Sequence, residues 1–104
     1  MEIKVQTNTG HKARLDQQLQ KPALYNVIIH NDDYTTMDFV VEVLIRIFNK
    51  KHEDAAMIMT HVHENGRGVA GTYTYDIAAT KKMETDKNSR ETGFPLKLTL
   101  EELG

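Results

Sequence analysis

The stretch that decides the fold is residues 28–44, IIHNDDYTTMDFVVEVL. Its first residues end an apolar run with the spacing of a β-strand, and its last residues begin an apolar run with the spacing of a helix. Between the two runs stand one amide and two carboxylates, Asn31, Asp32 and Asp33. The junction therefore predicts a strand, a polar turn and a helix in that order.

The strand side of the junction is LYNVIIH, residues 24–30. Tyr25, Val27 and Ile29 fall on one face at period two, which is the pattern of a strand covered on at least one side. Pro22 precedes this run, and we place a boundary there because a proline pushes the residue before it toward extended geometry.

The segment before that boundary, residues 1–21, is rich in Gln, Thr, Asn and Lys. It has few large apolar residues, so it cannot bury enough surface to offset the entropy of ordering. We therefore predict a flexible N-terminal arm over residues 1–21 and one core domain over residues 22–104.

The helix side of the junction is MDFVVEVLIRIFNKK, residues 37–51. Its apolar residues recur at helical spacing and form a broad stripe: Phe39, Val40, Val43, Leu44, Ile47 and Phe48. Thr35 and Asp38 resemble a capping box at the start, with Asp in place of Glu. Asn49-Lys50-Lys51 is expected to end the helix, with its cations near the negative end of the helix dipole.

The rest of the chain supplies two more helices and two more strands. A second helix is predicted over about 53–64, and Gly66 stops it because glycine takes the left-handed conformation at little cost. A strand over 67–75, a polar helix over 76–91 and a strand over 95–100 follow. The order β-α-α-β-α-β predicts an α+β two-layer sandwich, a three-stranded antiparallel sheet covered by three helices on one face.

Composition argues against several classes of function. The 104 residues suit one domain, and a net charge of -2 with both signs interspersed provides no basic patch for nucleic acid. The absence of cysteine excludes disulfides, thiolate nucleophiles and Cys-ligated zinc. No apolar run approaches the ~20 residues of a membrane span, and no secretory signal is evident. We expect no membrane partner and a cytoplasmic location.

The polar turn is expected to meet the second helix, because a short loop joins the two helices. Met59 and His63 lie one turn apart on the same side of that helix. If the turn packs against the His63 end, a small cavity forms. We expect a floor of Val40, Met59 and Val62 and a rim of Asn31, Asp33, Met37 and His63.

The expected rim consists mostly of hydrogen-bond acceptors. Asn31 offers an amide oxygen, Asp33 a carboxylate and neutral His63 a ring nitrogen, whereas a primary ammonium has three donors and no acceptor. The carboxylate adds charge assistance, and methionine in the floor adapts to side chains of differing shape. These features suit the N-terminal residue of a polypeptide, an ammonium beside a bulky apolar side chain.

The same residues also admit ordinary structural interpretations, and both possibilities stay open at this point. Asx residues before a helix are most often turn or cap elements. Met59 and Val62 at helical spacing more often belong to a core than to a pocket. A histidine near a helix end, such as His63, is more often a surface or capping residue.

The longer motifs resemble a known family. YNVIIHNDDYTTMDFVVEVL, AAMIMTHVHENGRGVAGTYTYDIAATK and FPLKLTL together resemble ClpS, the adaptor of the bacterial Clp protease. The resemblance covers residues 23–101, and the NDD-Y-T-x-M and M-x-x-V-H blocks are specific in combination. It implies a compact α/β domain with a flexible N-terminal arm.

The resemblance also implies a function without catalysis. ClpS adaptors bind a bulky hydrophobic N-terminal residue (Phe, Tyr, Trp or Leu) of N-end rule substrates. They hand the substrate to a hexameric AAA+ unfoldase, ClpA or a relative, which feeds the ClpP peptidase. We therefore expect an adaptor that is not an enzyme, needs no cofactor and acts as a monomer.

Carried over by residue, the resemblance assigns roles within this chain. The α-amino contacts would come from Asn31, Asp33 and His63, with Asp32 shaping the same turn. The side-chain pocket would be formed by Thr35, Met37, Val40, Met59, Val62 and Leu96. Met37 matches the gatekeeper that crowds the pocket against Ile and Val. The surface that docks on the unfoldase would include Asp76 and Lys81.

Some positions depart from the family pattern. Thr36 stands where relatives often have proline, and Ala79 replaces an acid common in the docking segment. Lys82, Glu84 and Thr85 make the third predicted helix unusually polar. These departures leave open which Clp unfoldase is the partner.

Two other functions are alternatives to the adaptor. The first is a regulator that acts through docking alone, without binding N-terminal residues. The second is a metal enzyme, suggested by His61-x-His63. Residues i and i+2 of a helix point to different sides and HEXXH is absent, so we expect no metal site.

Overall fold

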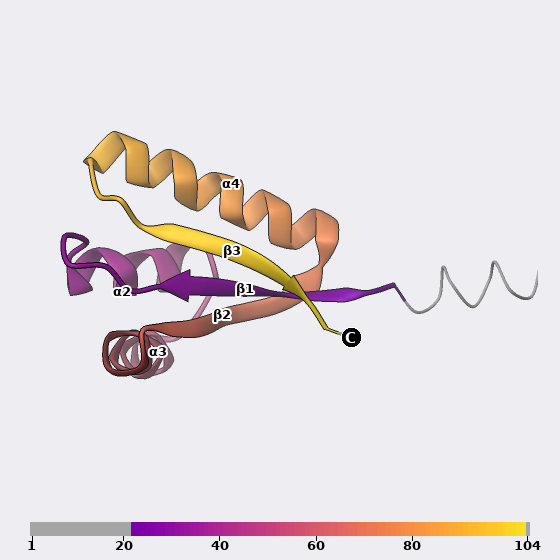
Figure 1. The fold of residues 1–104 in the computed structure, drawn as a ribbon, viewed down its shortest axis with the longest axis horizontal. Helices are drawn as coiled ribbons and strands as arrows, with labels where there is room; N and C mark the ends of the chain where they lie inside the picture. The colour runs from indigo at the N-terminus through magenta and orange to yellow at the C-terminus, as the bar shows by residue number, and fades with distance from the viewer. Residues whose placement is uncertain (1–21, 104) are drawn as a thin grey trace, which may run out of the picture.

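The computed structural model describes residues 22–103, which form strands and helices in the predicted order β-α-α-β-α-β (Figure 1). The elements are β1 (Leu24–His30), α2 (Met37–Arg46), α3 (His52–Asn65), β2 (Arg67–Thr74), α4 (Tyr75–Thr92) and β3 (Lys97–Glu102). The predicted arm over residues 1–21 lies outside the described residues. Of the helices within 22–103, none combines the length and hydropathy that a membrane crossing requires.

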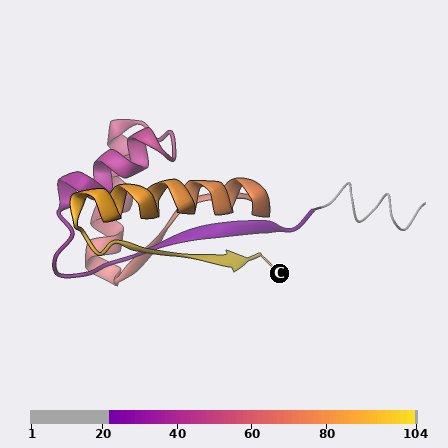
Figure 2. The ribbon, with the colours of Figure 1, turned by 90° about the horizontal axis from the view of Figure 1, so that it is seen from above.

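The sheet confirms the predicted fold class. Its strand order is β2-β1-β3, and β1 is antiparallel to both neighbours. The three helices of the described region lie on one side of the sheet (Figure 2). β1 is therefore the central strand, and the loop that follows it leads directly into the helical layer.

The apolar alternation in β1 builds the core between the sheet and the helices. Val27 and Ile29 are fully buried and pack in one cluster with Phe39, Val43 and Leu44 of α2. Burial of such side chains contributes about 25 cal/mol for each Å² of apolar surface removed from water. The helical stripe and the period-two strand predicted from the sequence are the two sides of this core.

The opposite face of the sheet is closed by side chains of the strands themselves. Ile28 points away from the core cluster, yet it is 2% exposed. Arg67 of β2 and Glu101 of β3 form an ion pair of 2.6 Å that crosses over β1. His30 and Thr99 share a hydrogen bond of 2.7 Å on the same face. These cross-strand pairs cover Ile28 without a helix.

The predicted end of the first helix was wrong by several residues. α2 ends at Arg46, and Ile47 already has the C-cap position, so Asn49-Lys50-Lys51 does not close the helix. The chain turns through Asn49, whose φ is 58°, and the N–H of Lys50 donates to the carbonyl of Leu44 over 3.0 Å. This turn directs Phe48 into the core, where it is 3% exposed.

The predicted cap of the same helix was also wrong by one residue. Thr36, not Thr35, is the N-cap, and its hydroxyl accepts from the N–H of Phe39 over 3.2 Å. The end of α3 is as predicted, because Gly66 follows it with φ of 89°. β3 starts at Lys97, two residues later than predicted.

Candidate functional site

The loop between β1 and α2 is folded around one carboxylate. Asp32 accepts from the N–H of Tyr34 over 2.8 Å and from the N–H of Thr35 over 2.6 Å. The Thr35 hydroxyl donates to the second oxygen of the same carboxylate over 2.7 Å. Asp32 is therefore the internal anchor of the turn, in the manner of Asx residues that bond to the backbone two residues on.

This bonding also sets the ionisation of Asp32. Partial burial disfavours the charged carboxylate, but the hydrogen bonds from Thr35 and Tyr34 favour it and outweigh that effect. The pKa of Asp32 consequently lies below its ordinary value. The turn that positions Asn31 and Asp33 is thus held by a carboxylate that is negatively charged at neutral pH.

A backbone hydrogen bond joins this loop to the end of α3. The N–H of Asn31 donates to the carbonyl of Gly66 over 2.9 Å, and the N–H of Gly66 donates to the carbonyl of Val62 over 2.8 Å. Gly68 then passes so close to α3 that an added Cβ would lie 2.8 Å from a methyl of Val62. These contacts fix the His63 end of α3 beside the Asn31 turn.

A cavity of about 500 Å³ lies where the loop, α2 and α3 meet. Its lining comes from three segments of the chain: Asn31, Asp32, Asp33, Tyr34, Thr35 and Thr36 from the loop, Met37 and Val40 from α2, and Met59, Val62 and His63 from α3. Val40 and Val62 are buried, Met59 is half-buried, and Asn31, Asp33 and His63 are exposed. The structure thus places an apolar floor beneath a rim of hydrogen-bond acceptors.

Nine of the ten residues expected at this site line the cavity, and Leu96 does not. Leu96 is 6% exposed, belongs to the core cluster and lines a separate hollow between α4 and the segment before β3. Its expected place in the side-chain pocket stays a prediction. The residue lies just before β3, which pairs with β1 on the side opposite to β2 and α3.

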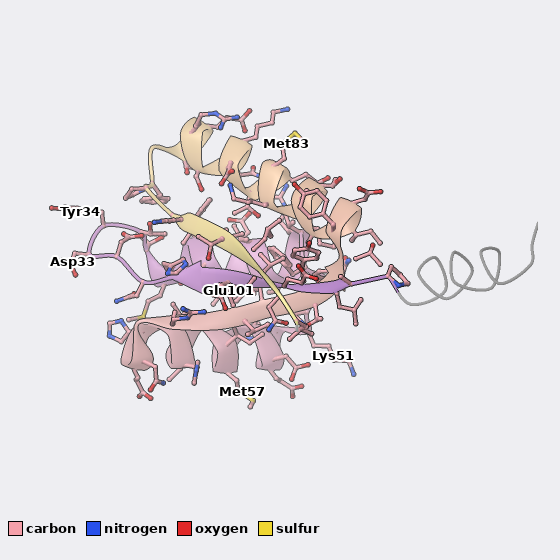
Figure 3. The ribbon with its side chains drawn as sticks, turned by 45° about the vertical axis from the view of Figure 1, so that its right-hand side comes forward. Asp33, Tyr34, Lys51, Met57, Met83 and Glu101 are labelled. Atoms are coloured by element: carbon pink, nitrogen blue, oxygen red, sulfur yellow. The ribbon has the colours of Figure 1, made fainter. Side chains whose placement is uncertain are left out.

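The sequence did not single out Tyr34 or Thr36 as lining residues, although both line the cavity. Tyr34 is 77% exposed and stands with Asp33 at the tip of the loop after β1, as Figure 3 shows. The position of Tyr34 between Asp33 and Thr35 is the signal that could have found it. Thr36 was missed because the sequence pattern predicted Thr35 as the helix cap.

The two residues expected on the docking surface differ in their surroundings. Asp76 is exposed at the start of α4. Lys81 is half-buried, and its ammonium donates to the carbonyl of Ile47 at the end of α2 over 2.7 Å. The ammonium also lies 5.9 Å and 5.4 Å from the ring centroids of Phe48 and Tyr73. Lys81 therefore links α4 to α2, whatever further contact it makes.

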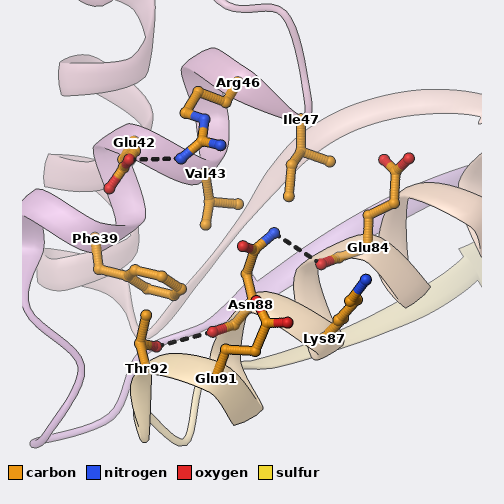
Figure 4. Close-up of a pocket in the computed structure, with 10 residues that line it drawn as sticks. All are labelled: Phe39, Glu42, Val43, Arg46, Ile47, Glu84, Lys87, Asn88, Glu91 and Thr92. Carbon is orange, nitrogen blue, oxygen red and sulfur yellow. Dashed lines mark hydrogen bonds and ion pairs between the residues drawn. The ribbon is translucent and has the colours of Figure 1, made fainter.

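Elsewhere in the described region there is a second hollow, and its chemistry differs from that of this site. Within residues 22–103, no group of three or more His, Asp or Glu side chains could hold a metal ion. A second hollow of about 420 Å³ lies between α2 and α4 (Figure 4). Its floor contains Phe39 and Val43, and Glu42 and Arg46 form an ion pair of 2.7 Å at its edge. Unlike the first cavity, it has no histidine or loop carboxylate.

Comparisons with known proteins agree on one family. The family model described as ATP-dependent Clp protease adaptor protein ClpS matches residues 20–99. The ATP-dependent Clp protease adapter protein ClpS of Clostridium acetobutylicum is 48% identical, over 97% of this chain and 100% of the relative. The protein of the same description from Caulobacter vibrioides (strain NA1000 / CB15N) is 56% identical, over 79% of this chain and 75% of the relative.

A solved structure shares the fold. It is that of Agrobacterium tumefaciens ClpS2 bound to L-phenylalaninamide, with a TM-score of 0.76 and 38% sequence identity. The match covers 79% of this chain and 99% of that chain. Sequence and fold agree over most of residues 22–103, and the chain belongs to the ClpS family of adaptors of the ATP-dependent Clp protease, a family of adaptors rather than enzymes.

Proposed function

We propose that this adaptor binds the N-terminal residue of a substrate polypeptide when that residue is bulky and hydrophobic: Phe, Tyr, Trp or Leu. The observation that carries the proposal is the cavity of about 500 Å³ with apolar Val40, Met59 and Val62 below and the acceptors Asn31, Asp33 and His63 above. A charged α-amino group needs three acceptors, and a large apolar side chain needs an apolar cavity. The cavity offers both within one site.

The ligand of the solved relative supports this proposal. L-phenylalaninamide has a free α-amino group, a benzyl side chain and an amide where the next peptide bond would begin. It is therefore a minimal copy of an N-terminal phenylalanine. Agrobacterium tumefaciens ClpS2 shares 38% of its sequence with this chain over the matched region. We propose that the same class of ligand binds here.

In this proposal each part of the site has one role. The carboxylate of Asp33, the amide oxygen of Asn31 and the neutral ring of His63 accept from the ammonium, and Asp32 holds the turn that presents them. The charge on Asp33 strengthens its hydrogen bond, because bonds to an ionised partner are about twice as strong as neutral ones. Thr35, Met37, Val40, Met59 and Val62 surround the side chain.

We further propose that the adaptor delivers its bound substrate to a Clp AAA+ unfoldase, ClpA or a relative, in the cytoplasm, for degradation by ClpP. Membership in the family of Clp protease adaptors supports this step. Asp76, exposed at the start of α4, is the proposed docking contact, with Lys81 beside it on the same helix. In this proposal the segment 1–21 is the arm that the unfoldase engages during handover.

Delivery is tested with purified ClpA and ClpP and a fluorescent substrate that begins with Phe. The chain should accelerate degradation of that substrate and not of the same substrate beginning with Ala. Removal of residues 1–18 should slow degradation and leave substrate binding unchanged. A chain that retunes the unfoldase equally for both substrates would instead be a regulator that acts through docking alone.

A further inference from the structure

A groove between α2 and α3 continues from the candidate site. It has a volume of about 590 Å³, and its floor is formed by Val41 and Ile45 of α2 and Ala56 and Met59 of α3. All four of these side chains are half-buried, so the floor is apolar and open to solvent along its length.

Met59 joins the groove to the cavity that we propose for the N-terminal residue. It is the one described residue that lines both spaces. In the cavity it lies among Val40, Val62 and His63, and in the groove it lies among Val41 and Ala56. Only the side chain of Met59 therefore separates a ligand in the cavity from the groove.

The chemistry of the site sets the direction in which a bound polypeptide must leave. The α-carbon of its first residue carries an ammonium, a side chain and a carbonyl group, and these point in different directions. If Asn31, Asp33 and His63 hold the ammonium and the floor holds the side chain, the carbonyl faces the remaining side of the mouth. Met37 lines the cavity and Asp38, the next residue, lines the groove, so a chain that leaves past Met37 reaches the groove at once.

The length of the groove matches a short stretch of extended chain. Along α2 it runs from Asp38 to Arg46, which is about 12 Å at 1.5 Å per helical residue. An extended polypeptide rises about 3.3 Å per residue, so the groove accommodates about three residues. These would be the residues that follow the one in the cavity.

The edges of the groove define which side chains suit it. Glu42 is paired with Arg46 over 2.7 Å, so this edge is neutralised. Asp38, at the end nearest the site, has no ion pair within the described residues. An apolar side chain suits the floor, and an acidic side chain next to Asp38 is disfavoured by repulsion between like charges.

We infer that the groove between α2 and α3 binds the second to fourth residues of the substrate and favours apolar side chains there. This inference rests on the proposed function, because the first residue must sit in the cavity for the following residues to enter the groove. The adaptor then recognises the first few residues of the substrate rather than the N-terminal residue alone. Substrates with the same first residue would be captured with different affinities.

The experiment compares two ligands in the full chain by competition binding. L-Phenylalaninamide reports the cavity alone, whereas the peptide Phe-Ala-Leu-Leu reports the cavity and the groove. Ala56→Gln fills the groove with a longer polar side chain, keeps a good helix former and removes no core atom. The matched control is Asn88→Gln, which lengthens a side chain in the hollow on the other flank of α2 (Figure 4).

Ala56→Gln should weaken the peptide about tenfold, which corresponds to about 1.4 kcal/mol, and change L-phenylalaninamide by less than about twofold. Asn88→Gln should change neither ligand. In the unmodified chain, Phe-Ala-Leu-Leu should bind about tenfold more tightly than Phe-Gly-Gly-Gly. Equal affinity for these two peptides overturns the inference, even if the substituted chains unfold.

The proposed function fails in a different and separate way. If L-phenylalaninamide does not bind the unmodified chain, the cavity itself is wrongly assigned and the inference falls with it. If L-phenylalaninamide binds and the two peptides are equal, the cavity stands and the groove is unused. A peptide effect of Ala56→Gln that is matched by Asn88→Gln also contradicts a role for the groove.

Discussion

Asn31 and Gly66 are joined by a backbone hydrogen bond of 2.9 Å from the N–H of Asn31 to the carbonyl of Gly66. The bond connects the residue after the central strand to the residue that ends α3. It sets the distance between the loop carboxylates and His63 without using any side chain. The geometry of the rim therefore depends on the close approach of β2 to α3.

Gly68 permits that approach, so Gly68→Ala should damage stability and binding together. The new Cβ would lie 2.8 Å from Val62 Cγ2 and 3.1 Å from His61 Cδ2. Overpacking of this kind costs about 1–3 kcal/mol, or roughly 4–8 °C of melting temperature for each kcal/mol. Thermal unfolding and peptide affinity measure the two effects.

Gly93→Ala is the control for Gly68→Ala, because its Cβ meets nothing within 4 Å. It should lower stability through its φ of 84° and leave affinity unchanged.

Thr35→Val should raise the pKa of Asp32 toward the ordinary value of about 3.9, because the hydroxyl that donates to the carboxylate is lost. Because the pKa of Asp32 is lower in the folded chain than in the unfolded chain, its carboxylate stabilises the fold at a pH above the unfolded-state pKa. This contribution disappears as the pH falls through the folded-state pKa. Carboxyl titration by NMR gives the pKa directly. Thr36→Val, which removes the helix cap instead, should leave the pKa of Asp32 in place.

His63→Ala should weaken the binding of a peptide that begins with Phe about tenfold. The ring of His63 supplies one of the three acceptors proposed for the ammonium, and alanine supplies none. Anisotropy titrations with the labelled peptide compare the variant with the unmodified chain. Equal affinity of the two chains would remove His63 from the proposed role.

Met37→Ala should admit peptides that begin with Val or Ile. Met37 lines the cavity and is 48% exposed, so its shortening widens the mouth without opening the core. We expect a gain of about tenfold for these peptides and little change for Phe, measured by competition against a labelled peptide. If Val and Ile peptides gain nothing, Met37 is not the group that excludes them.

Lys81→Met should destabilise the fold by about 1–2 kcal/mol, because the cation at the C-terminal end of α2 is lost. Lys82→Met is the matched control. Lys82 pairs with Asp86 over 2.8 Å within α4, and such pairs contribute about 0.3–0.5 kcal/mol. Denaturant unfolding compares the two. Equal losses would show that the contact with Ile47 contributes little.

The sequence predicts the local structure around the junction, but it does not predict the contacts that this region makes with residues distant along the chain. Period two in β1, period 3.6 in α2 and Gly66 after α3 each depend on neighbouring residues. The end of α2 does not, because the carbonyl of Ile47 is capped by Lys81, which lies 34 positions further along the chain. No pattern around Asn49 indicates that contact.

The site shows the same division. Residues of one short turn, such as Asn31 and Asp33, reach the cavity together, and Met59 and His63 follow from helical spacing. Leu96 was assigned by resemblance alone, and it belongs to the core cluster without lining this cavity, so its role stays a prediction. Either of two neighbouring threonines could cap α2. The hydroxyl of Thr35 donates to Asp32, so Thr36 is the residue whose hydroxyl caps the helix.

The central claim is that one site recognises the ammonium and the bulky side chain together, and fluorescence anisotropy tests it most directly. Three labelled peptides are compared: one that begins with Phe, the same peptide N-acetylated, and one that begins with Ala. Acetylation removes the charge and two donors while leaving the side chain. The account predicts binding of the first peptide alone. Equal binding of the acetylated peptide, or no binding of the first, would contradict it.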